Sequence, residues 1–157
     1  MEDEGIRADE SEAQRLDRNF NELLQELRVA QTGVQILFAF LLTLPFGARF
    51  GGVDTFELVV YVVALLAATA AAAMIIAPVA YHRMLFRRGQ KPQLVRSAHR
   101  MASGGLAFLL VSMVGSVLLV TDFVAGRVLG TIVSAAAAVW FVMLWVVLPW
   151  RRRGDGD

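Results

Sequence analysis

Four long runs of residues without a charged side chain constrain the fold of this chain more than any other feature. They cover residues 29–46, 58–80, 101–121 and 128–150. A helix of about 20 apolar residues is long enough to cross the hydrocarbon core of a bilayer. Apolar residues also make up 57% of the 157-residue chain, compared with about 45 to 50% in soluble domains. The sequence therefore predicts an all-α protein whose four spans form a four-helix transmembrane bundle.

The first span continues a helix that begins well before the membrane. Ser11 and Gln14 have the spacing of a capping box, in which two side chains satisfy free N–H groups at a helix start. Apolar residues then recur every three or four positions, at Leu16, Phe20, Leu23, Leu27, Ala30, Val34, Leu37, Leu41 and Leu44. This pattern predicts an N-terminal amphipathic helix that continues into the first span. Either it bends near Gly33 and lies on the bilayer surface, or it stays straight and pairs with copies of itself.

Composition predicts the domain organisation. Residues 1–10 are acidic and have little to bury, so we expect a disordered tail. Residues 11–150 form a single transmembrane domain, and residues 151–157 form a cytoplasmic tail. Residues 122–127 are expected to be the loop between the last two spans. Trp140 falls near the middle of the fourth span, where we expect it to pack within the bundle.

Positive charges predict the orientation of the spans. Six bases and no acid lie between the second and third spans, at Arg83, Arg87, Arg88, Lys91, Arg96 and Arg100. Three more, Arg151 to Arg153, follow the fourth span, whereas the other two loops hold one base each. Because cytoplasmic loops carry an excess of Lys and Arg, both termini are predicted to lie in the cytoplasm. These six bases are also candidates for contact with anionic lipid headgroups. The alternatives are purely topogenic charge, or docking of Glu22 and Glu26 against Arg96 and Arg100.

Small residues line the predicted helix faces. They include an alanine-rich second span, the ladder Gly126, Gly130, Ser134 and Ala138, and the positions Gly104, Gly105, Ser112, Gly115 and Ser116. Small side chains let membrane helices approach closely. Together with the repeat that leads into the first span, these faces predict a homo-oligomer.

Gln31, Thr32 and Gln35 form the deepest strongly polar cluster of the four spans. In an oligomer they could line a narrow pore, although hydrogen bonding between helices is the simpler interpretation. No Asp, Glu, Lys, Arg or His lies within the four spans, and a coupled cation transporter normally needs such a residue. We find no catalytic, cofactor or metal-binding motif, no cysteine, and no sign of nucleic-acid binding. The sequence therefore favours a structural or interaction module over an enzyme.

Three stretches carry a family resemblance. They are RLDRNFNELLQELRVAQTGVQILFAFLLTLPF (residues 15–46), APVAYHRMLFRRG (residues 77–89) and AHRMASGGL (residues 98–106). Here the chain resembles an uncharacterised family of small actinobacterial integral membrane proteins, a domain of unknown function with four transmembrane helices. The resemblance implies a bacterial inner membrane location and no established activity. Some members are labelled sodium:proton antiporters, so a small cation transporter is the alternative to a self-associating module.

Overall fold

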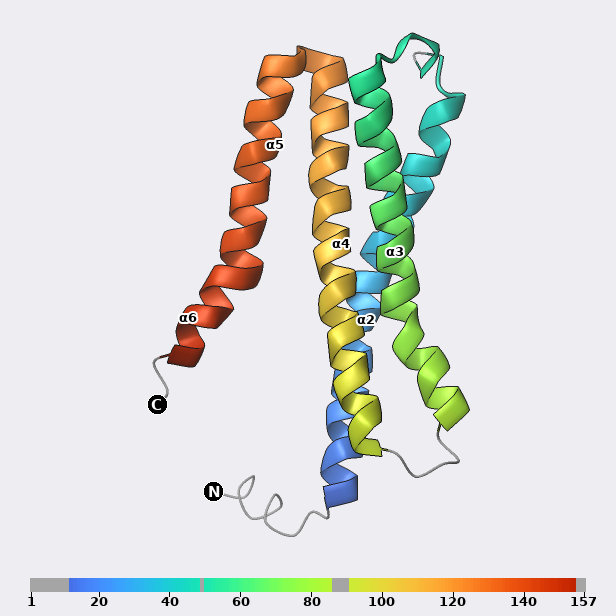
Figure 1. Ribbon diagram of the computed structural model, residues 1–157, viewed down its shortest axis with the longest axis vertical. Helices are drawn as coiled ribbons and strands as arrows, with labels where there is room; N and C mark the ends of the chain where they lie inside the picture. The colour runs from blue at the N-terminus through green and yellow to red at the C-terminus, as the bar shows by residue number, and fades with distance from the viewer. Residues whose placement is uncertain (1–11, 49, 86–90, 155–157) are drawn as a thin grey trace.

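The computed structural model describes residues 12–48, 50–85 and 91–154, and within these residues the chain is helical with no strand (Figure 1). The long helices are α2 (Glu12–Thr43), α3 (Thr55–Leu85), α4 (Lys91–Ala125) and α5 (Arg127–Val142). The short elements are the 3-10 turns η1 (Leu44–Phe46) and η2 (Phe50–Gly52), the π-helical turn η3 (Met143–Val147) and α6 (Leu148–Gly154). The all-α prediction is confirmed. The tail predicted for residues 1–10 lies outside the described residues.

Four helical segments are long and apolar enough to cross a membrane. They are Glu22–Phe46, Thr55–Ala80, Ser97–Ala125 and Arg127–Arg151. Each contains most or all of one predicted span, so the four-span prediction is confirmed. Successive spans run in opposite directions. The start of α2 and the end of α6 therefore lie at the same end of the bundle, which we call the termini end; at the opposite end, the Gly126 end, α4 turns into α5 (Figure 1).

Helix α2 runs without interruption through Gly33. Its apolar repeat is turned toward its own chain: Leu27, Val34 and Leu41 are almost wholly buried against α3 and α4. From Leu27 to Leu41, the apolar stripe that could have paired with a second copy therefore packs against helices of its own chain. Ser11, half of the predicted capping box, lies outside the described residues, although the helix does begin at the next residue, Glu12.

Helices α3 and α4 pack closely because small residues face one another. A Cβ atom on Gly105 would lie 2.8 Å from Cγ1 of Ile75, and one on Gly115 would lie 3.1 Å from Cβ of Ala64. The Ser112 hydroxyl donates a buried hydrogen bond of 2.9 Å to the Ala64 carbonyl. The small faces predicted for these two spans therefore meet each other.

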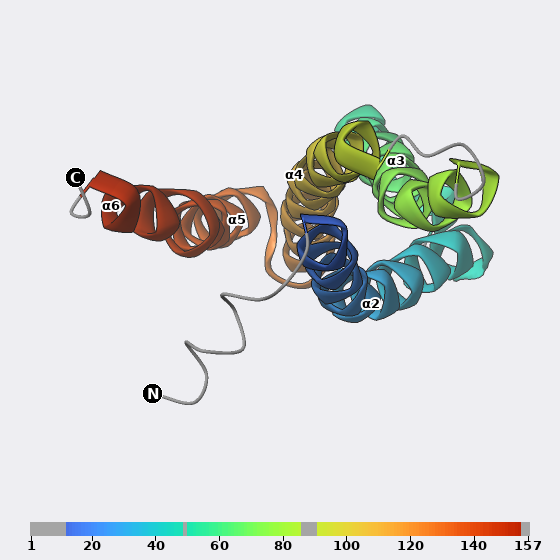
Figure 2. The ribbon, with the colours of Figure 1, turned by 90° about the horizontal axis from the view of Figure 1, so that it is seen from below.

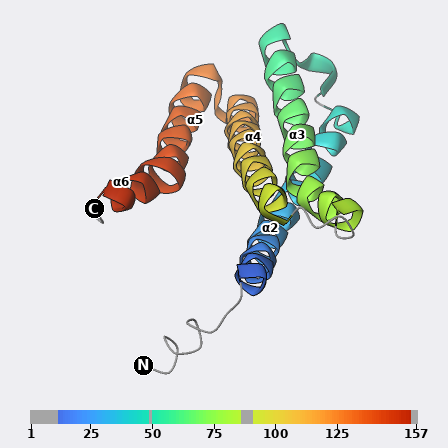
Figure 3. The ribbon, with the colours of Figure 1, turned by 60° about the horizontal axis from the view of Figure 1, so that its bottom comes forward.

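Helix α5 contacts α4 and, among the long helices described, no other. Figures 2 and 3 show α5 and α6 to one side of the cluster formed by α2, α3 and α4. The ladder of small residues on α5 faces α4, where Gly130 and Ser134 are buried. Trp140 is 67% exposed. The prediction that it packs within the bundle is wrong, because none of the described helices covers that side of α5.

The connection between α4 and α5 is shorter than predicted. Helix α4 continues through Asp122 to Ala125, so only Gly126 separates it from α5 instead of a loop over residues 122–127. Gly126 has a φ of 86°, a conformation that residues with a Cβ atom rarely adopt. A single glycine therefore reverses the chain.

Proline has different effects in the two helices that contain it. Pro78 lies inside α3, which continues to Leu85. Pro149 has no N–H to donate to the Trp145 carbonyl and crowds that group. The helix widens just before it into the turn η3, where the Leu148 N–H donates to the Met143 carbonyl. This wider turn lies where α5 and α4 are furthest apart (Figure 1).

Candidate functional site

The predicted polar cluster on α2 does not converge on an interior cavity of the chain. The Thr32 hydroxyl donates to the Arg28 carbonyl of its own helix at 3.1 Å. Gln31 is half-buried and Gln35 is exposed, and neither side chain is hydrogen-bonded to another described residue. A pore role for Gln31, Thr32 and Gln35 would depend on other copies of the chain and stays a prediction.

The predicted lipid-contacting bases lie mostly beyond what the structure describes. Arg87 and Arg88 fall outside the described residues, and only the backbone is described for Arg83, Lys91 and Arg96. Arg100 is exposed, ten residues into α4. Contact between these bases and lipid headgroups therefore stays a prediction.

Three charged residues form a polar clasp at the Gly126 end. The Arg127 guanidinium lies 3.1 Å from Oδ2 of Asp122 and 2.5 Å from Oδ2 of Asp54. The Asp122 side chain is only 6% exposed, whereas Arg127 is 43% exposed. Removing a carboxylate from water is costly unless a cation accompanies it. The clasp thus joins the start of α5 to the end of α4 and the start of α3.

The start of α3 orients the clasp. The Asp54 N–H donates to Oε2 of Glu57 at 2.7 Å, and the Glu57 N–H donates to Oδ1 of Asp54 at 2.9 Å. This reciprocal pairing is a capping box. The Arg127 guanidinium also lies 4.1 Å above the centre of the Phe56 ring, a cation–π geometry. The hydrogen bond from the Glu57 amide, followed by that from Arg127, lowers the pKa of Asp54 below its ordinary value of 3.8.

The sequence patterns did not connect these charged residues with one another. The D-x-x-E pattern from Asp54 to Glu57 is a readable capping signal. The pairing of Asp54 with Arg127, 73 residues apart, has no local signal.

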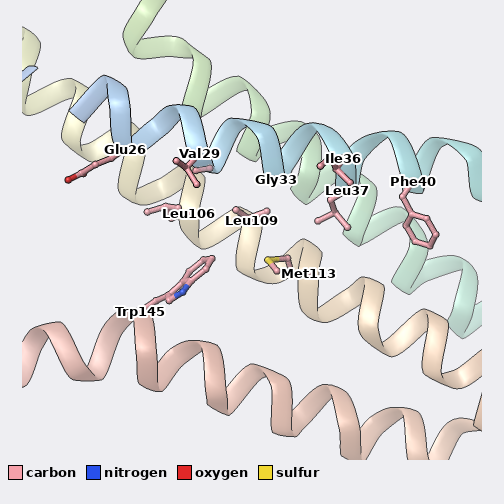
Figure 4. Close-up of a pocket in the computed structure, with 11 residues that line it drawn as sticks. Glu26, Val29, Gly33, Ile36, Leu37, Phe40, Leu106, Leu109, Met113 and Trp145 are labelled. Atoms are coloured by element: carbon pink, nitrogen blue, oxygen red, sulfur yellow. The ribbon is translucent and has the colours of Figure 1, made fainter. Parts of the chain in front are cut away.

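An apolar groove opens between α2, α4 and η3, the turn that continues α5; we call it the α2–α5 groove (Figure 4). It has a volume of about 650 Å³. Its walls are Glu26, Val29, Ala30, Gly33, Ile36, Leu37 and Phe40 of α2, Leu106, Leu109 and Met113 of α4, and Trp145. The α2 wall runs for about 21 Å from Glu26 to Phe40. Every lining residue except Glu26 is uncharged.

The side chain of Trp145, a residue of η3, lies in the gap between η3 and α4. Figure 4 shows its ring reaching from η3 toward Leu106 and Leu109 on α4. The Trp145 ring also makes an edge-to-face contact with the ring of Phe141, one helical turn earlier, and the two ring centroids are 5.3 Å apart. A second groove of similar volume lies on the other side of Trp145 and Leu106. Trp145 therefore bridges a gap that is apolar on both sides.

Glu26 is a charged residue within the first apolar helical segment. It falls within the apolar helical segment Glu22–Phe46, so this segment is longer than the span drawn at residues 29–46 and includes ionisable residues. Figure 4 shows Glu26 at the termini end of the α2–α5 groove, with its carboxylate pointing out of that end, away from the apolar lining residues. The preceding acid on that side, Glu22, pairs with Arg18 at 3.8 Å. Glu26 forms no ion pair with a described residue.

The described residues contain no group of three or more acids, histidines or cysteines that could hold a metal ion. No curated protein matches the chain, and no solved structure matches it. A family of unknown function does match, over residues 9–149. Those residues include the first three apolar helical segments and all but the last two residues of the fourth. The chain therefore belongs to the DUF6328 family, a family of unknown function.

Proposed function

We propose that the chain is a structural or interaction module of the membrane, with no catalytic role, that associates with itself through the outer face of α5. One observation carries this proposal: α5 packs against α4 alone and buries only Gly130 and Ser134. Of the four apolar helical segments, the one that begins with α5 is the least enclosed: 6% of an 18-residue apolar stretch is buried, compared with 33% in the span of α3. Most of its surface is therefore open to a second copy.

The outer face of α5 has suitable chemistry for such a contact. Val128, Ile132, Ala135 and Val139 follow one another at helical spacing on the side away from Gly130 and Ser134, and all are exposed. Ala135, at the middle, would let two helices approach closely. The two features that favoured self-association in the sequence, the α2 repeat and the α5 ladder, face their own chain. The proposed contact therefore uses a different surface from either.

Cysteine crosslinking tests this contact, because the chain has no cysteine of its own. We expect Ile132→Cys on α5 to form a disulfide-linked dimer in membranes. Val62→Cys is the matched control, because Val62 is also apolar and exposed, on α3. Native mass spectrometry in lipid nanodiscs should show two or more copies. A strictly monomeric species, or equal crosslinking at both positions, would contradict the proposal.

A small cation transporter of the sodium:proton antiporter type is the second candidate. Glu26 favours it, because it is an acid within an apolar helical segment and lines a groove. Such a protein would show cation-dependent proton flux in proteoliposomes, and Glu26→Gln would abolish the flux. Absence of flux in the unmodified protein would leave the interaction module as the proposal.

We also propose a bacterial inner membrane location with both termini and the basic residues in the cytoplasm. The excess of bases around residues 83–100 and 151–153 supports this orientation. Single cysteines at Gly51 and Gly154 lie at opposite ends of the bundle and should react with an impermeant reagent from opposite sides.

Bases near an anionic membrane surface contribute about 1 kcal/mol each to lipid binding. Replacing Arg100 by Gln should therefore weaken binding of phosphatidylglycerol measurably in native mass spectrometry.

A further inference from the structure

We propose that the α2–α5 groove binds a single-chain cationic amphiphile, with its hydrocarbon tail between α2 and α4 and its positive head beside Glu26. This inference goes beyond the proposed self-association, which uses the opposite face of α5. It rests on the shape of the groove, its single charge and its position relative to the membrane.

The shape of the groove suits a linear tail. Its α2 wall extends about 21 Å and is lined by apolar side chains from Val29 to Phe40. Leu106, Leu109 and Met113 form the opposite wall. Gly33 lies midway along α2, and a Cβ atom placed on it would meet nothing within 4 Å. The groove is thus open at its middle and presents no polar group that would repel a hydrocarbon chain.

The charge of the groove selects the head. Glu26 is the only ionisable residue that lines it, and it has no ion pair with a described residue. Arg100 and Arg151 are exposed but do not line the groove. An anionic head would meet the Glu26 carboxylate without compensation, whereas an ammonium head would pair with it. The groove therefore favours positive over negative amphiphiles.

The depth of the groove in the membrane suits the head and the tail of such an amphiphile. Glu26 lies 20 residues before Phe46, or about 30 Å along α2, which is the thickness of the hydrocarbon core. Its carboxylate would therefore lie at headgroup level while the walls of the groove lie among the lipid tails. An amphiphile could enter sideways from the bilayer, between α2 and η3, without passing through water.

Quenching of Trp145 fluorescence tests the proposal in the full chain. Trp140→Phe and Trp150→Phe leave Trp145 as the single tryptophan, because the chain has three. The protein is placed in phosphatidylcholine nanodiscs and titrated with 12-bromododecyltrimethylammonium, whose bromine quenches tryptophan. The neutral probe 12-bromododecanol has the same tail. Comparing each probe between variants removes differences in how the probes partition into lipid.

We expect saturable quenching by the cation and a half-quenching concentration about three- to fivefold higher after Glu26→Gln, since exposed ion pairs contribute up to about 1 kcal/mol. The alcohol should be unaffected by this change. Glu22→Gln is the matched control for charge and should alter neither probe. Gly33→Leu should weaken both probes by filling the groove, whereas Ala39→Leu, exposed on α2 outside the groove, should not.

Two results would overturn the proposal. Equal half-quenching concentrations for the cation in the Glu26→Gln variant and the parent would show that Glu26 does not select the head. Quenching that rises linearly and is insensitive to Gly33→Leu would show that only bulk lipid reaches Trp145. Circular dichroism of each variant establishes that the helices are intact, so either result bears on the groove itself.

Discussion

Helix α4 meets α3 on one side and α5 on another, and these two interfaces differ in how far they extend. Against α3, the glycines Gly105 and Gly115 of α4 meet Ile75 and Ala64 of α3 at well-separated heights. Against α5, close approach is confined to the Gly126 end, where a Cβ on Gly130 would lie 3.0 Å from the backbone nitrogen of Asp122. Further along, Trp145 stands in the gap. The size of the facing side chains at each height decides whether two membrane helices stay together.

The polar contacts differ in the same way. The α3–α4 interface contains the buried hydrogen bond from Ser112 to the Ala64 carbonyl. The α4–α5 interface depends on the polar clasp, in which Arg127 is half exposed. The first interface is therefore closely packed from Gly105 to Gly115 of α4, while the second is held mainly at one end. This contrast predicts that equivalent substitutions have unequal effects on the whole bundle.

The largest effect is expected from Gly105→Leu. Its Cβ would collide with Cγ1 of Ile75 and lie 3.4 Å from the Ala71 carbonyl oxygen and the Ile75 backbone nitrogen. Overpacking of this kind costs about 2 to 3 kcal/mol of the free energy of unfolding. Reversible unfolding in mixed micelles, followed by circular dichroism, measures the loss.

Gly33→Leu is the matched control for this substitution. It makes the same change in a transmembrane helix where a Cβ would meet nothing within 4 Å. We expect no loss of stability, because leucine also favours the helix more than glycine does. Equal losses at both positions would show that the close α3–α4 contact does not hold the bundle.

A smaller and more local effect is expected from Gly130→Leu. The atoms that its Cβ would meet are the backbone nitrogen and Cα of Asp122, which cannot move aside as a side chain can. We expect α5 to separate from α4 at a cost of about 1 to 2 kcal/mol, while α2, α3 and α4 stay packed. Spin labels at Val111 and Val139, both exposed, should report a longer distance. An unchanged distance would mean that Gly130 does not hold α5 in place.

The comparison also shows what could be predicted from the sequence. The spans and the small faces of α3 and α4 follow from composition and helical period, which are local properties, and the structure confirms both. The ladder of Gly130 and Ser134 was correctly seen as a packing surface, although the partner expected for it was another copy of the chain. A face of small residues shows that a helix packs closely against another helix, but it does not identify which helix that is.

Two features had no such local signal. Trp140 was expected inside the bundle because of its depth, but depth does not determine which side of α5 is covered. The clasp brings together Asp54 and Arg127 across 73 residues, and the α2–α5 groove exists only because α5 diverges from α4. Glu26 was assigned to the segment before the first span, so its place on the groove wall could not be seen.

Ser112→Ala is expected to lower the free energy of unfolding by about 0.6 kcal/mol, the average for a hydrogen bond between membrane helices. The substitution removes the 2.9 Å bond to the Ala64 carbonyl. That carbonyl belongs to the interior of α3, so it keeps its helical N–H partner. Ser116→Ala is the control, because the Ser116 hydroxyl bonds to the Ser112 carbonyl of its own helix. The same unfolding assay should show a loss at Ser112 that is greater than the loss at Ser116.

The smallest effect concerns the clasp and depends on pH. Hydrogen bonds from the Glu57 amide and Arg127 lower the pKa of Asp54 in the folded state, so the folded protein binds this proton less readily than the unfolded chain. The stabilisation is therefore fully present above the ordinary pKa of 3.8 and is lost as the pH falls through the lowered value. The melting temperature should accordingly decrease below about pH 4.

Asp54→Asn isolates this contribution from the other carboxyl groups. The difference in melting temperature between parent and variant should be positive at pH 7 and shrink toward zero in acid, because asparagine does not titrate. Arg127→Gln should reduce the difference at pH 7, since Arg127 is one of the two partners that hold the carboxylate charged. A difference that stays constant between pH 7 and pH 3 would show that the Asp54 charge does not help to hold α5 at this end. The attachment of α5 at this end would then rest on the Asp122–Arg127 pair and on the close packing at Gly130.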